Sequence, residues 1–188
     1  MIDNTGQRPS FAAGLALSCL FTALICAGAY LSIPIGPIPL TLGNFFVILG
    51  ALLLGPGWGG LSAVLYVVIG SLGFPVFSGG RGGLAQLVGP TGGYLFGYIV
   101  GALVAGFLAK KRSRMMMASA SVLGFLVILL LGSLGLSILS GIPWPKALSL
   151  GVLPFLPGDA LKTVLATLIA IRLGAFTDSL RLRSGSHG

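Results

Sequence analysis

The chain alternates between long apolar stretches and short connections rich in glycine and proline. The apolar stretches are six in number, at approximately 11–31, 41–54, 59–73, 92–109, 115–139 and 158–174. About 20 helical residues cross a hydrocarbon core of about 30 Å, and a single chain can cross lipid as helices because each helix satisfies its own backbone. The pattern therefore predicts an all-α integral membrane protein with six transmembrane helices.

The second and third stretches are shorter than a full span, because fifteen helical residues cover only about 22 Å. Gly55-Pro56-Gly57 separates them with a strong turn signal. Two interpretations stay open, a helical hairpin extended by its flanks and a re-entrant pair. We expect two spans.

Composition excludes a soluble domain. Of the 188 residues 55% are hydrophobic and 7% are charged, against about 25% charged in soluble domains. Residues 9–80 contain no charged side chain at all, so no face of that segment is suited to water.

The net charge of +8 indicates topology rather than binding of nucleic acid, because the basic residues gather at one set of helix ends. With a cytoplasmic N-terminus, eight basic residues fall on the inner side and three on the outer side. The inner set is Arg8, Lys110, Lys111, Arg112, Arg114, Arg172, Arg181 and Arg183, and the outer set is Arg81, Lys146 and Lys162. The positive-inside rule then predicts cytoplasmic termini. We expect a cytoplasmic segment 1–10, a single membrane domain 11–174 that begins with a retained anchor, and a cytoplasmic polar tail 175–188.

The outer connections are long and rich in glycine and proline, yet they remain apolar. Nine of the eleven prolines fall on that side. Irregular backbone at membrane depth is tolerated where protein or a water-filled cavity covers it. We therefore interpret 74–91 and 140–157 as folded caps over a cavity that opens outward.

Ionisable residues at membrane depth are costly and point to function. Asp159 and Lys162 lie three residues apart, on one helix face. Their alternative role is structural, with Asp159 capping the last helix and pairing with Lys162. Arg81 stands between two pairs of glycines, where exposed amides and a guanidinium suit a carboxylate or phosphate. The alternative is a flexible loop with a solvated arginine.

Three further polar residues lie near the expected cavity. Thr91 and Tyr94 begin the fourth span and offer hydrogen-bonding groups, although Tyr94 also fits an interface anchor. Asn44, early in an apolar span, needs partners and could equally hold two helices together.

On the first span the small residues Cys19, Ala23 and Ala27 recur every four positions, a spacing that suits either a partner protein's helix or a neighbouring span.

The sequence contains few of the residues that enzymatic catalysis requires. There is no Walker motif, no cluster of cysteine and histidine, and Asp159 is the one acidic residue away from the ends. We expect no metal, no cofactor and no catalytic residue.

Taken together, the motifs resemble the BioY family, the biotin-binding S components of energy-coupling-factor (ECF) transporters. The resemblance covers nearly the whole chain. It is strongest at Leu20–Tyr30, Ile33–Leu42, Pro75–Leu84, Gly89–Tyr98 and Pro154–Lys162. The glycine-arginine strip, the following Gly-Pro-Thr-Gly-Gly-Tyr and the Pro-Gly-Asp-x-x-Lys motif make a specific combination.

The resemblance implies a six-helix S-component bundle in the prokaryotic cell membrane, with an outward-facing pocket for biotin. It assigns ligand binding to Arg81, Asp159 and Lys162. The family commonly has Thr-Leu-Gln where this chain has Thr41-Leu42-Gly43, and Asn44 is expected to replace the amide. Tyr66 is expected to stand where some members place an asparagine.

Biotin offers a carboxylate, which suits Arg81 or Lys162, ureido N–H groups, which suit Asp159, and an apolar bicycle. We expect the aromatic side chains Phe74, Phe77, Trp144 and Phe155 to wall the bicycle. The implied partners are a transmembrane coupling subunit and two ATPase subunits, and a homo-oligomer is also compatible. The rival functions are an S component for another vitamin and a membrane-embedded enzyme acting on lipid.

Overall fold

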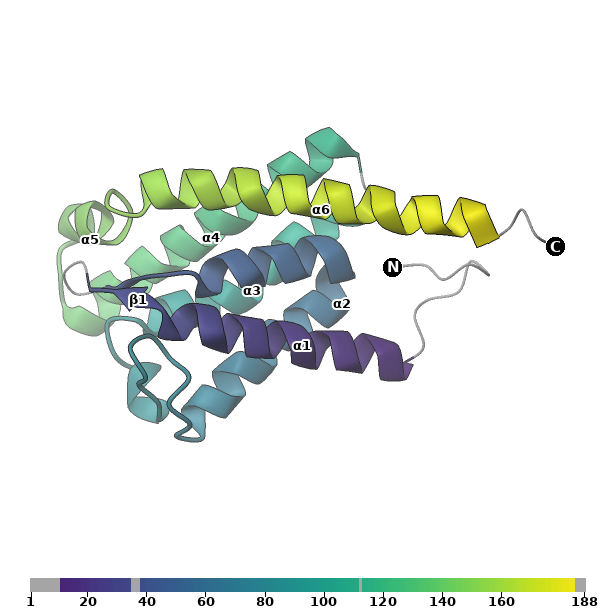
Figure 1. Ribbon diagram of the computed structural model, residues 1–188. Helices are drawn as coiled ribbons and strands as arrows, with labels where there is room; N and C mark the ends of the chain where they lie inside the picture. The colour runs from purple at the N-terminus through teal and green to yellow at the C-terminus, as the bar shows by residue number, and fades with distance from the viewer. Residues whose placement is uncertain (1–10, 35–37, 112, 185–188) are drawn as a thin grey trace.

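The expected all-α fold is confirmed by the computed structural model, which describes residues 11–34, 38–111 and 113–184, with side chains as far as 174. The elements in chain order are α1 (Phe11–Tyr30), β1 (Ser32–Ile33), β2 (Leu40–Thr41), α2 (Gly43–Ser71), the 3₁₀ turn η1 (Leu84–Gln86), α3 (Gly92–Leu108), the 3₁₀ turn η2 (Ala109–Lys111), α4 (Arg114–Ser140), α5 (Trp144–Gly151) and α6 (Leu156–Ser184) (Figure 1). Most predicted helix ends fall within a few residues of these bounds. The exceptions are α6, which ends at Ser184 rather than near 174, and α5, which lies in the segment 140–157 that was expected to be an irregular cap. The expected segment 1–10, Arg112 and residues 185–188 lie outside the described residues.

Helix α2 contains both short apolar stretches and reverses direction between them (Figure 1). The break is at Gly55, whose φ of 80° and ψ of −177° are not helical, and Pro56 follows it. A Cβ atom built on Gly59 would lie 2.6 Å from the Cα of Ala51. Residues eight positions apart meet this closely when the chain folds back, so α2 is a pair of short antiparallel helices. Whether the pair makes two full spans or is re-entrant stays a prediction.

Helix α1 packs against both halves of this hairpin. Ser18 Oγ donates to the carbonyl of Trp58 at 2.9 Å, and Thr22 Oγ1 donates to the carbonyl of Ser62 at 3.1 Å. The second half of α2 therefore runs parallel to α1. The first half runs antiparallel to α1, because Gly28 approaches Leu42 while Gly50 approaches Phe21.

Among the described residues, four helices are long and apolar enough to cross a membrane: α1, α2, α4, and α3 continued through η2 to Lys111. The pair α5 and α6, bent by 54°, passes the same test together and makes a fifth. Because the hairpin α2 accounts for two of the six predicted stretches, these elements include all six. Helix α6 continues to Ser184, so the expected polar tail from 175 begins as helix.

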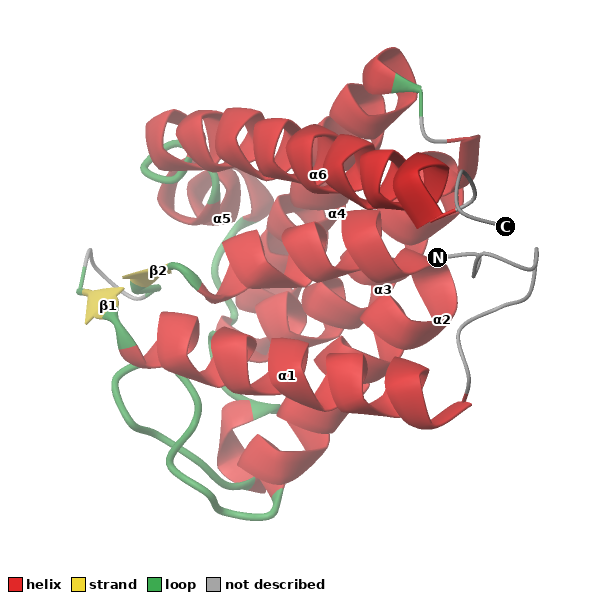
Figure 2. Cartoon of the chain, turned by 45° about the vertical axis from the view of Figure 1, so that its right-hand side comes forward, coloured by secondary structure: helices red, strands yellow, loops and turns green. Residues whose placement is uncertain are grey.

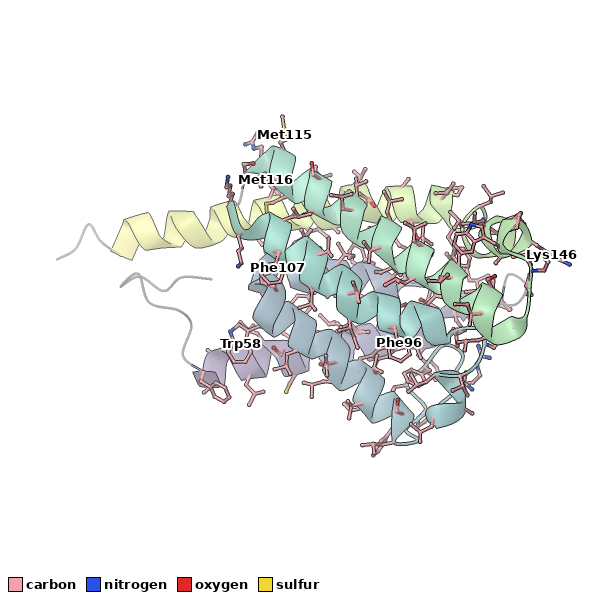
Figure 3. All side chains as sticks on the ribbon, turned by 180° about the vertical axis from the view of Figure 1, so that it is seen from behind. Trp58, Phe96, Phe107, Met115, Met116 and Lys146 are labelled. Atoms are coloured by element: carbon pink, nitrogen blue, oxygen red, sulfur yellow. The ribbon has the colours of Figure 1, made fainter. Side chains whose placement is uncertain are left out.

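The irregular segments gather at one end of the bundle. Figure 2 shows β1, β2, the connecting loops and α5 on the same side of the helices. In Figure 3 Lys146 of α5 marks this end, and Phe107 and Met115 mark the opposite end, where α1 begins and α6 ends. The loop end is therefore where the outer side was predicted, and Lys110, Lys111 and Arg114 lie at the other end. Which end faces the cytoplasm stays a prediction.

Candidate functional site: a polar pocket under the loops

A pocket of about 620 Å³, including its open mouth, lies at the loop end of the bundle. Helices α1 to α4 and α6 and the loops between them supply its lining, which consists of Ala29, Ile38, Pro39, Thr41, Asn44, Tyr66, Phe77, Ser78, Arg81, Gln86, Thr91, Tyr94, Leu95, Tyr98, Ile128, Leu129, Phe155 and Asp159. Six of the seven predicted ligand-binding residues are in this lining. The seventh, Lys162, is not.

A buried polar cluster joins the start of α2 to the start of α6. Asn44 Nδ2 donates to Asp159 Oδ1 at 3.0 Å, and Lys162 Nζ donates to the same oxygen at 3.0 Å and to Asn44 Oδ1 at 3.0 Å. The three side chains are between 3% and 7% exposed. A carboxylate and an ammonium at this depth are tolerable because each neutralises the other and both are hydrogen-bonded.

Lys162 is fully engaged within the protein. Besides Asn44 and Asp159, its ammonium donates to the carbonyl of Thr41 at 2.7 Å. Three acceptors match the three N–H donors of a lysine. Lys162 thus ties strand β2 to α6, and the prediction that it could hold a ligand carboxylate finds no free donor to support it.

Asp159 has one oxygen left over. Its Oδ2 is buried and has no hydrogen-bond partner among the described residues. The structural alternative combined a helix cap with a pair to Lys162. The pair is present, but the cap is not supported, because the backbone N–H of Asp159 already bonds to the carbonyl of Phe155 and its side chain bonds to Asn44 and Lys162. A buried oxygen without a donor is costly, and this one belongs to a residue that lines the pocket.

Aromatic rings form much of the apolar lining. The ring of Tyr66 stacks on that of Tyr98, with centroids 5.9 Å apart, and it makes an edge-to-face contact with the ring of Phe77, with centroids 5.4 Å apart. Phe155 lies 6.3 Å from Tyr94. Phe77 and Phe155 are therefore placed as expected, whereas Phe74 and Trp144 are 58% and 41% exposed and stand outside the lining.

Arg81 lies on a tight turn at the mouth of the pocket and is exposed. The backbone of Phe77 pairs with that of Arg81, with Phe77 N donating to Arg81 O at 2.8 Å. Within the turn Gly79 and Gly80 have φ of 69° and 73°, a region that favours glycine. The glycines around Arg81 are thus explained by the turn that presents its side chain.

The two predicted residues of α3 differ in role. Thr91 lines the pocket just before the helix. Tyr94 also lines it, but its hydroxyl donates to the carbonyl of Gly151 at 2.7 Å. That bond holds the end of α5 over the pocket, so the hydroxyl serves the cap.

Sequence reasoning missed Tyr98, Gln86 and Ser78, which also line the pocket. A signal for Tyr98 was available, because it follows Tyr94 by four positions and shares its helix face. Gln86 and Ser78 lie on loop segments whose path the sequence does not fix.

The small residues on α1 face away from the bundle. Cys19, Ala23 and Ala27 are exposed or nearly so, whereas Gly14, Ser18, Phe21 and Ile25 are buried against α2. Of the two interpretations, packing against a neighbouring span of this chain is therefore excluded. The stripe is open to lipid or to another protein.

Comparison with known proteins gives a consistent result. The model of the BioY family matches residues 4–178. The chain is 48% identical to the biotin transporter BioY of Thermotoga maritima, over 82% of this chain and 91% of that protein. It is 45% identical to the probable biotin transporter BioY of Pyrococcus horikoshii, over 85% and 94%. A crystal structure of the S-component for biotin from an ECF-type ABC transporter superposes with a TM-score of 0.81 at 32% identity, covering 87% of this chain and 92% of that one.

Proposed function

Because the chain belongs to the BioY family, we propose that it captures biotin at the outer face of the cell membrane, as the binding subunit of a vitamin importer. Its relatives are biotin transporters, which places the chain among transport proteins rather than enzymes. The rival of a lipid-modifying enzyme is thereby set aside.

One observation carries the choice of ligand, the unpaired Oδ2 of Asp159 in the pocket lining. A ureido ring presents N–H donors and no positive charge. The charge of the Asp159 carboxylate is already neutralised by Lys162, but Oδ2 can still accept a hydrogen bond. Such an oxygen is suited to a neutral N–H donor. Asn44 and Lys162 act indirectly, by fixing Oδ1 and leaving Oδ2 for the ligand.

The remaining groups of biotin match the rest of the pocket. The apolar bicycle suits the rings of Tyr66, Tyr98 and Phe77, which pack against one another. The carboxylate suits Arg81, which stands at the mouth and is not paired with an acidic side chain of the described residues. We therefore propose that the ureido ring lies beside the buried Asp159 and the acid beside the exposed Arg81.

For transport we propose the partners that an ECF-type importer uses, a transmembrane coupling subunit and two ATPase subunits. The exposed stripe of Cys19, Ala23 and Ala27 supports this, because small side chains let a partner helix approach closely in lipid. The proposed orientation has both termini in the cytoplasm, so that the pocket opens outward.

Calorimetric titration of the purified chain in detergent tests the ligand. Biotin should give saturable one-site binding, and thiamine and riboflavin should give none. Preferential binding of either of these vitamins, or no heat with biotin, would contradict the proposal.

A further inference from the structure

We propose that the hydroxyl of Ser78 is a second recognition group for the ligand's carboxylate, acting beside Arg81. This inference rests on the proposed function and adds a specificity residue to it. It concerns how the pocket distinguishes the free acid from its esters and amides.

The hydroxyl of Ser78 is left without a partner. Its Oγ is buried, it has no hydrogen-bond partner among the described residues, and the residue lines the pocket. Buried hydroxyls nearly always find a partner. Two other buried hydroxyls, those of Ser133 and Thr167, also lack a partner among the described residues, but neither residue lines the pocket. Ser78 is therefore the kind of group that a ligand completes.

The turn from Phe77 to Arg81 fixes Ser78 and Arg81 relative to each other. Gly80 N donates to the carbonyl of Phe77 at 3.0 Å and closes the turn. The Nε of Arg81 donates to the backbone carbonyl of Ser78 at 3.0 Å. This bond uses the backbone of Ser78 and leaves its hydroxyl, and it uses one guanidinium nitrogen and leaves the two terminal ones.

A hydroxyl and a guanidinium on one turn form a set of donors that suits an anion. A carboxylate has two oxygens and accepts several hydrogen bonds, and bonds to charged acceptors are stronger than neutral ones. Asp159, the one acidic residue of the lining, belongs to a different wall on α6 and offers only an acceptor oxygen, so a ligand carboxylate finds hydrogen-bond donors at the turn and not at Asp159. The ligand class that this subsite favours is therefore a free carboxylate, in preference to an ester or a secondary amide.

Ser78→Ala and Ser78→Cys test the inference, with biotin and biotin methyl ester as the two ligands. Neither change touches the backbone carbonyl that holds Arg81. For biotin the Kd should rise about tenfold or more in both variants, because a hydrogen bond to a charged group is lost or weakened. For the ester the Kd should rise less than about threefold, because the ester carbonyl is a weaker acceptor.

Ser149→Ala is the matched control, since Ser149 is exposed on α5 and its hydroxyl bonds to the carbonyl of Lys146. It should bind both ligands as the unchanged chain does. Equal losses for acid and ester, or full affinity of Ser78→Cys for biotin, would overturn the inference. Unchanged biotin affinity in Ser78→Ala would also overturn the inference. If Asp159→Asn still bound biotin weakly, the proposed function would stand without a role for Ser78. A wild-type chain that does not bind biotin would remove both.

Discussion

The ammonium nitrogen of Lys162 lies 3.0 Å from Oδ1 of Asp159, and the two residues occupy neighbouring positions on one face of α6. Both are buried, and Asn44 is the only other side chain among the described residues that is hydrogen-bonded to this pair. The pair is therefore a neutral unit inside the bundle, with one carboxylate oxygen, Oδ2, that has no partner among the described residues.

Removing one charge of this pair should be worse than removing both. Asp159→Asn leaves a buried ammonium, and Lys162→Met leaves a buried carboxylate, so each should lower stability by about 3 kcal/mol. The double variant should recover much of that loss. Chemical denaturation in detergent gives the coupling through a double-mutant cycle.

In the same variants biotin affinity separates binding from folding. Asp159→Asn and the double variant should both bind biotin weakly, because the ureido N–H loses its charged acceptor. Additive losses of stability would argue against the neutral unit. A folded Asp159→Asn variant with unchanged affinity would remove Asp159 from the binding site.

Arg81→Ala should weaken biotin by more than about 1.5 kcal/mol, since a charged hydrogen bond to the carboxylate is lost. Biotin amide should lose less, because it carries no charge. Calorimetry with both ligands checks this, and Lys146→Ala is the control, an exposed basic residue at the same end of the bundle that does not line the pocket. Equal losses for acid and amide would make Arg81 a structural residue.

The two ends of the bundle should face opposite compartments. Reporters fused after Lys111 and after Pro145 should show cytoplasmic and external activity respectively, because η2 and α5 lie at opposite ends and basic residues favour the cytoplasmic side. A reporter after Arg8 controls for the sidedness of the start. Identical sidedness for Lys111 and Pro145 would contradict the proposed orientation.

Ala23→Phe should reduce co-purification with a coupling subunit and leave biotin binding intact. The substitution adds bulk to the exposed face of α1, away from the pocket, where close helix approach requires small residues. Val122→Phe on α4, also exposed to the surroundings, provides the matched control. If both variants retained the partner equally, the stripe on α1 would not be its contact.

Gly135→Ala should destabilise the fold by about 1–3 kcal/mol, the usual cost of overpacking. A Cβ there would collide with the backbone of Gly93, where α3 and α4 cross. Gly57→Ala meets no atom within 4 Å and should be close to neutral. Thermal melting of the two proteins compares them, and equal midpoints would mean that the crossing can relax.

Much of this organisation could be predicted from the sequence, because few backbone structures can cross a lipid bilayer. Apolar length fixed the helices, and the scarcity of charge drew attention to Asp159, Lys162 and Arg81. The pair of Lys162 with Asp159 was one of the predicted alternatives, but the bond of Lys162 to the carbonyl of Thr41, 121 positions away, could not be predicted. Ser78 could not be predicted for a similar reason, because a hydroxyl can be recognised as unpaired only when the surrounding structure is known.

The hairpin of α2 allows a helix too short to cross the membrane to stand at the centre of the bundle. Its first half, residues 43–54, ends at the break at Gly55 and is about 18 Å long at 1.5 Å per residue, well short of a hydrocarbon core of about 30 Å. Gly106 of α3 covers the turn, since a Cβ there would lie 2.5 Å from the nitrogen of Pro56. Nine of the twelve residues 43–54 are buried and none is exposed, so other helices of the chain cover this half, and its length need not match the thickness of the bilayer.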